Sequence, residues 1–64
     1  MDTKILDVLK TMETHFRGAT EDAFKFAQGN NSAGTRVRKA MQTIKNLAQD
    51  IRVEVQEQKN SVAA

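Results

Sequence analysis

Apolar residues recur in alternating steps of four and three along most of the chain, and this period limits what the chain can fold into. In the first segment the pattern is unbroken over three heptads and comprises Ile5, Leu9, Met12, Phe16, Ala19, Ala23 and Phe26. Such a pattern is typical of a helix that packs along one face, so residues 2–28 are predicted to be helical. Asp2 or Thr3 is expected to cap its first turn.

A second periodic segment covers residues 32–60. Its apolar stripe comprises Val37, Ala40, Met41, Ile44, Leu47, Ala48, Ile51 and Val55. This stripe is wider than the contact line of a two-stranded coiled coil, and it favours a helix that touches two neighbours. Residues 61–64 are expected to form a frayed end.

Residues 29–32, Gly-Asn-Asn-Ser, separate the two helical segments. Gly29 can adopt the left-handed conformation that ends a helix, and Asn30, Asn31 or Ser32 can cap the next one. So short a connection between two helices predicts an antiparallel hairpin. The predicted fold is therefore a single all-α helical-hairpin domain.

The size of the chain argues for a partner. A chain of 64 residues buries only ~60% of the surface that it exposes when unfolded. It has no Cys for a disulfide, and its single His, His15, is too few ligands for a zinc site. Packing against another chain is the remaining source of stability. We expect two hairpins to form a four-helix bundle, as a homodimer or higher homo-oligomer.

Positive charge is concentrated in the second segment. Residues 1–32 carry a net charge of −1 and residues 33–64 a net charge of +3, and residues 34–52 hold five bases against one acid. Four bases spaced by seven follow one flank of the apolar stripe, namely Arg38, Lys45, Arg52 and Lys59. Such a line attracts phosphates, although charges beside a helical core also serve solubility and pairing alone.

The start of the second helix is another candidate for anion binding. The first turn of a helix offers unpaired amides and a partial positive charge. Gly34 and Thr35 would let an anion approach the backbone, and Arg36, Arg38 and Lys39 would add charge. The alternative is an ordinary solvated turn with normal capping.

No set of residues predicts catalysis. His15 is the only candidate for proton transfer, and Phe16 and Phe26 are expected in the core, with Phe24 at a second interface. Without a pocket of convergent polar groups we expect no enzyme, no cofactor, no metal site and no small-molecule substrate. No apolar run approaches the ~18 residues of a membrane span, and the chain does not begin like a secretory signal. The expected location is the cytoplasm and its nucleoid, with no membrane partner.

Residues 29–60 resemble a known family. The pattern is a Gly-Asn break and a turn of small residues, followed by Thr35-Arg36-Val37-Arg38-Lys39 and then by Ile44-Lys45-Asn46-Leu47-Ala48-Gln49-Asp50-Ile51-Arg52. It resembles the bacterial linker-histone-like family, the chlamydial histone-like proteins and their short relatives. The resemblance implies nonspecific DNA binding and chromosome organisation. Carried over by position, it points to Arg36, Arg38, Lys39, Lys45 and Arg52.

Chlamydial members of that family continue into a long tail rich in Lys and Ala, which this sequence lacks. We therefore expect modest binding of double-stranded DNA by a dimer, without sequence preference and through phosphate contacts. The alternative is a helical oligomerisation or adaptor module that binds a protein partner and uses its bases for solubility.

Overall fold

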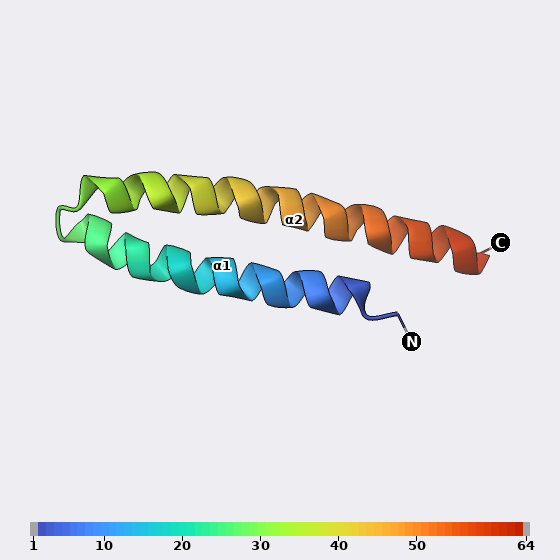
Figure 1. The fold of residues 1–64 in the computed structure, drawn as a ribbon. Helices are drawn as coiled ribbons and strands as arrows, with labels where there is room; N and C mark the ends of the chain where they lie inside the picture. Colours follow the sequence, from blue (N-terminus) through green and yellow to red (C-terminus); the bar gives the residue numbers. More distant parts are fainter. Residues whose placement is uncertain (1, 64) are drawn as a thin grey trace.

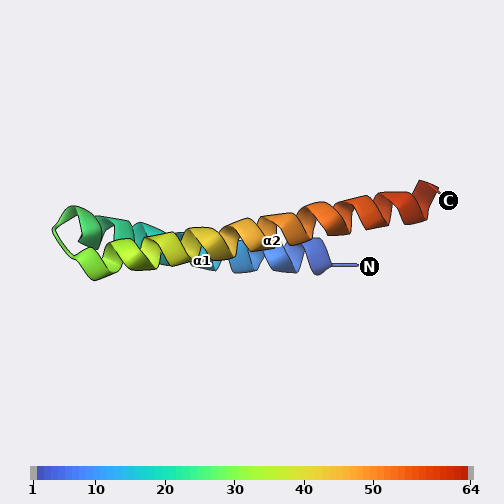
Figure 2. The same cartoon turned by 90° about the horizontal axis from the view of Figure 1, so that it is seen from above.

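Two antiparallel helices make up the fold (Figures 1 and 2). The computed structural model describes residues 2–63 and the side chains of residues 2–61. Helix α1 spans Lys4–Ala27 and helix α2 spans Asn31–Ala63, and the described residues contain no strand. The all-α prediction is confirmed, and the arrangement is the expected hairpin. The predicted boundaries, 2–28 and 32–60, differ by one to three residues. Residues 61–63, expected to fray, continue α2, and residue 64 lies outside the described residues.

The turn explains why the chain reverses where it does. Gly29 has a φ of 102°, which only glycine adopts without strain. The Gly29 amide donates to the carbonyl of Phe26 at 3.0 Å, and the Asn30 amide donates to that of Lys25 at 3.0 Å. These two bonds form the Schellman motif, which satisfies the last carbonyls of α1. Asn30 then caps α2, because its side-chain oxygen accepts from the Ala33 amide at 3.1 Å.

The contact between the helices follows a heptad pattern on both sides. The side chains of α1 that turn toward α2 are Ile5, Val8, Met12, His15, Ala19 and Asp22. Those of α2 that turn toward α1 are Ala33, Val37, Ala40, Ile44, Leu47, Ile51, Glu54 and Gln58. Only Ala19, Ala33 and Ile44 are buried among the described hydrophobic residues, with exposures of 7%, 0% and 8%. Because two of these three are alanines, the core of one hairpin is thin.

Three residues of the predicted stripe of α1, namely Leu9, Phe16 and Ala23, do not face α2. Phe16 is 48% exposed, Phe26 is 53% exposed and Leu9 is 43% exposed, so the prediction that both phenylalanines lie in the core is wrong for the single chain. The apolar stripe of α1 is wider than the surface that a single neighbouring helix covers. The hairpin places Val8 and His15 at the contact, and each displaces its next neighbour toward solvent. Phe24 lies on the outer side of α1 and is 69% exposed.

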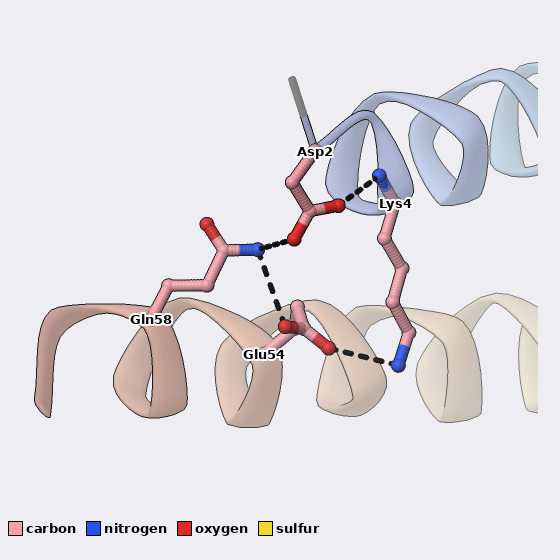
Figure 3. Close-up of polar contacts among 4 residues, drawn as sticks. All are labelled: Asp2, Lys4, Glu54 and Gln58. Atoms are coloured by element: carbon pink, nitrogen blue, oxygen red, sulfur yellow. Dashed lines mark hydrogen bonds and ion pairs between the residues drawn. The ribbon is translucent and has the colours of Figure 1, made fainter. Parts of the chain in front are cut away.

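A polar cluster of Asp2, Lys4, Glu54 and Gln58 joins the helices at the open end (Figure 3). The ammonium of Lys4 lies 2.8 Å from Oε1 of Glu54. The side-chain amide of Gln58 donates to Asp2 at 2.9 Å and to Glu54 at 3.2 Å, and Asp2 accepts from the backbone amide of Lys4 at 2.9 Å. The hydrogen bonds from Lys4 and then Gln58 lower the pKa of Glu54, and the bond to Glu54 raises the pKa of Lys4.

Candidate nucleic-acid interface

Three of the five predicted DNA-binding residues form one continuous edge of α2. Arg38, Lys45 and Arg52 are exposed and lie one heptad apart, and Lys59 extends the line by a further heptad. We call these four residues the basic edge. A rise of 1.5 Å per residue separates neighbouring bases by about 10 Å and gives the edge a length of about 30 Å. An extended polyanion can therefore contact several of these bases at once.

The other two predicted residues lie elsewhere on the helix. Lys39 is exposed on the outer side of α2, turned by about 100° from Arg38. Arg36 lies on the opposite flank of the interhelix contact from the basic edge. There its Nε donates to Oδ1 of Asp22 at 2.9 Å, with side-chain exposures of 47% for Arg36 and 19% for Asp22. The ion pair leaves Arg36 with less charge to offer a ligand than Arg38 has.

The acids of α2 are separated from the basic edge. Asp50, Glu54 and Glu57 all follow the flank that carries Arg36. Glu54 is held there by Lys4, and the three acids lie together along one shallow groove beside α1. Because charges of opposite sign occupy opposite flanks, the acids of α2 do not neutralise the basic edge.

The start of α2 differs from the sequence interpretation. The space beside the backbone of Gly34 is filled by the ring of Phe26, whose Cδ1 would lie 2.6 Å from a Cβ at residue 34. Gly34 therefore serves the contact between the helices instead of leaving room for an anion. Thr35 stays exposed, and a shallow groove runs from Phe26 past Thr35 to Arg38.

Asp22 is the functional neighbour that sequence reasoning missed. In the sequence it is one of several acids of the first segment, with no sign of a partner. The signal is its distance from the turn: in an antiparallel hairpin that reverses at Gly29, residue 22 lies seven residues before the turn and Arg36 seven residues after it. Counting outward from the turn would have paired them.

Other kinds of site lack support in the part of the chain that the structure describes. No group of three His, Asp or Glu side chains there could hold a metal ion. His15 is half-buried at the interhelix contact, away from the grooves found on the surface. Neither helix, within residues 2–63, is long and apolar enough to cross a membrane.

Comparison with known proteins places the chain in a family by sequence. The sequence model of the family described as "Histone H1-like protein Hc1" matches residues 7–61, which includes most of α1 and nearly all of α2. No curated protein and no solved structure matches the chain.

Proposed function

The chain belongs to the Hc1 family of histone H1-like proteins, and on that basis we propose that it binds double-stranded DNA without sequence preference, through the basic edge of α2. The family is one of DNA-binding, histone-like proteins of the nucleoid. For this chain we propose in addition how DNA is bound and which residues contact it. Arg38, Lys45 and Arg52 are the principal phosphate contacts, with Lys59 beside them and Lys39 and Arg36 as weaker contributors.

The separation of charge along α2 is the observation that supports this assignment. Four bases repeat every seven residues on one exposed edge, and the acids of the same helix lie on the other flank. Double-stranded DNA carries about one negative charge per 1.7 Å of its axis. An edge about 30 Å long therefore runs beside many phosphates, and long cationic side chains at intervals of about 10 Å suit phosphate contact better than base readout.

We propose that the DNA-binding form is a homodimer arranged as a four-helix bundle. Two hairpins would double the charge available to DNA, and each would contribute one basic edge. A particle with two such edges can bridge or bend DNA, which is the physical basis for organising a nucleoid.

A mobility-shift titration of the full chain against random-sequence duplex DNA at several salt concentrations tests the proposal. We expect the logarithm of the binding constant to fall linearly with the logarithm of salt, with a slope of about −0.9 for each phosphate contacted. The triple variant Arg38→Gln, Lys45→Gln and Arg52→Gln should weaken binding and lower the magnitude of this slope by about 2–3.

The matched control removes the same charge from α1. Lys10, Arg17 and Lys25 are exposed bases away from the basic edge, and their triple replacement by Gln should change the slope much less. Equal loss in both triple variants would show that net charge alone matters and that the basic edge is not the site. No shift at low salt with excess protein would instead favour the adaptor module.

A further inference from the structure

The two flanks of the hairpin have different chemistry. One flank carries both interhelix ion pairs, Lys4–Glu54 and Asp22–Arg36. The other flank carries the residues that directly follow Val8, His15 and Asp22 on α1 and Ala40, Leu47 and Glu54 on α2. These six side chains, which we call the apolar flank, are Leu9, Phe16 and Ala23 of α1 and Met41, Ala48 and Val55 of α2. Equivalent heptad positions of an antiparallel pair lie on the same side, so the six form one surface.

Five of the six residues of the apolar flank are exposed in the single chain, and Ala48 is half-buried. Leu9, Phe16, Met41 and Val55 are 43%, 48%, 42% and 37% exposed. Scattered exposed apolar residues are normal on a protein surface, but a row of them on one face marks an interaction site. None of the six is charged, although more than a quarter of the chain is.

The exposed area matches what a dimer interface would remove. The chain exposes 5167 Å², whereas a compact monomer of 7.2 kDa is expected to expose about 4100 Å². The difference, about 1000 Å², is close to the ~800 Å² that each partner buries in a stable protein interface. The chain therefore exposes enough surface for a second copy to cover. Because the core of one hairpin is small, burial of that surface would add stability that the single hairpin lacks.

We infer that the apolar flank is the surface on which a second copy of this chain docks, with α1 of each copy lying over α2 of the other. This inference deepens the proposed homodimer by naming its face and orientation. A two-fold axis would bring the same flank of both copies together, as in other symmetric dimers.

Charge selects this orientation over the one that stacks α2 on α2. The outer border of the apolar flank is the basic edge on α2, and on α1 it includes Glu13. Stacking α2 on α2 would set two basic edges against each other. With α1 over α2, the two-fold axis runs along the helices, and the register fixed by the contacts of Lys4 with Glu54 and of Asp22 with Arg36 brings Glu13 level with Lys45 of the second copy. This one acid faces the basic edge at Lys45 and leaves Arg38, Arg52 and Lys59 of the edge for DNA. The two basic edges then lie at opposite sides of the dimer.

Sedimentation of the full chain without DNA tests the docking face. We expect the wild type to sediment at twice the mass of one chain and Phe16→Glu at the mass of one chain. Phe24→Glu is the matched control, because it puts the same charge on the same helix at a more exposed residue that lies off the flank. It should remain a dimer. A monomeric wild type, or dissociation by the change at Phe24 and not at Phe16, would overturn the inference.

A charge swap tests the orientation and does not depend on whether Phe16→Glu folds. Glu13→Lys and Lys45→Glu should each raise the dimer dissociation constant several-fold, and the double variant should restore it. Failure of the double variant to restore the dimer would overturn the stacking of α1 on α2. These measurements contain no DNA, so a dimer that fails to bind DNA would count against the proposed function and leave the docking face intact.

Discussion

The ring of Phe26 lies directly over the backbone of Gly34, across the turn of the hairpin. A Cβ at residue 34 would come within 2.6 Å of Cδ1 and 2.7 Å of Cε1 of that ring. Real Cβ atoms essentially never approach another atom so closely, so only glycine allows this packing. The contact packs the last turn of α1 against the first turn of α2, next to the reversal of the chain.

Gly34→Ala should destabilise the hairpin by about 1 kcal/mol. The new methyl group would force the ring of Phe26 aside, and overpacking of this kind costs about 1–3 kcal/mol. The gain in helix propensity from Gly to Ala offsets up to about 1 kcal/mol of that. Thermal unfolding followed by circular dichroism at fixed protein concentration measures the difference.

Gly18 provides the matched control, since a Cβ at residue 18 would meet nothing within 4 Å. Gly18→Ala should stabilise the protein by up to about 1 kcal/mol. In a Phe26→Ala background, Gly34→Ala should become stabilising as well. If Gly34→Ala raised the melting temperature as much as Gly18→Ala, the ring would not be packed on residue 34 as described.

Arg36 and Arg38 should respond differently to the same substitution. Arg38→Gln removes a free charge from the basic edge and should lower the magnitude of the salt slope of DNA binding by about 0.9. Arg36→Gln removes a charge already paired with Asp22 at 2.9 Å, so its effect on DNA binding should be clearly smaller. Mobility-shift titrations of the two single variants under the same salt series compare them directly. A larger effect at Arg36 would place the contact at the start of α2.

Ile44→Asp should prevent folding. Ile44 is 8% exposed and is the largest of the three buried hydrophobic residues in the described part of the chain, so a carboxylate there would be buried without a partner. Leu6→Asp is the control, because Leu6 is 51% exposed and lies outside both the interhelix contact and the apolar flank. Circular dichroism should show loss of helix for the first variant and retention for the second. A helical, cooperatively unfolding Ile44→Asp would contradict the packing described here.

The helices and the turn were predictable from the sequence because local patterns decide them. The spacing of apolar residues by four and three predicted both helices, and Gly29 predicted the reversal of the chain. The inward face of α1 was not predictable in the same way. Val8 precedes Leu9 and His15 precedes Phe16, and hydrophobicity alone favours the second residue of each pair. In the structure the first residue of each pair faces α2, and this choice depends on contacts between the helices that no local pattern contains.

The candidate site was predictable in its composition and only partly in its geometry. The spacing by seven identified Arg38, Lys45 and Arg52 as one line, since a heptad returns to the same face of a helix. It could not show that Arg36 would be paired, because the partner, Asp22, comes from the other helix. Long-range pairs depend on the register of the hairpin, which is obtained only by counting residues outward from the turn at Gly29 on both helices.

The polar cluster at the open end should make stability depend on pH in acid. The pKa of Glu54 is lowered, first by the hydrogen bond from Lys4, so the folded protein binds this proton less readily than the unfolded chain. The stabilisation is therefore present at neutral pH and is lost as pH falls through the lowered pKa of Glu54. The pKa of Lys4 is raised, so its contribution to stability is present at neutral pH and is lost only as the solution becomes strongly alkaline.

Thermal unfolding across the acid range measures this effect. Glu54→Gln should flatten the fall in stability with falling pH, while Glu21→Gln, on the outer side of α1, should leave that fall unchanged. An unaltered acid profile in Glu54→Gln would mean that the pair with Lys4 does not hold the helix ends together in solution.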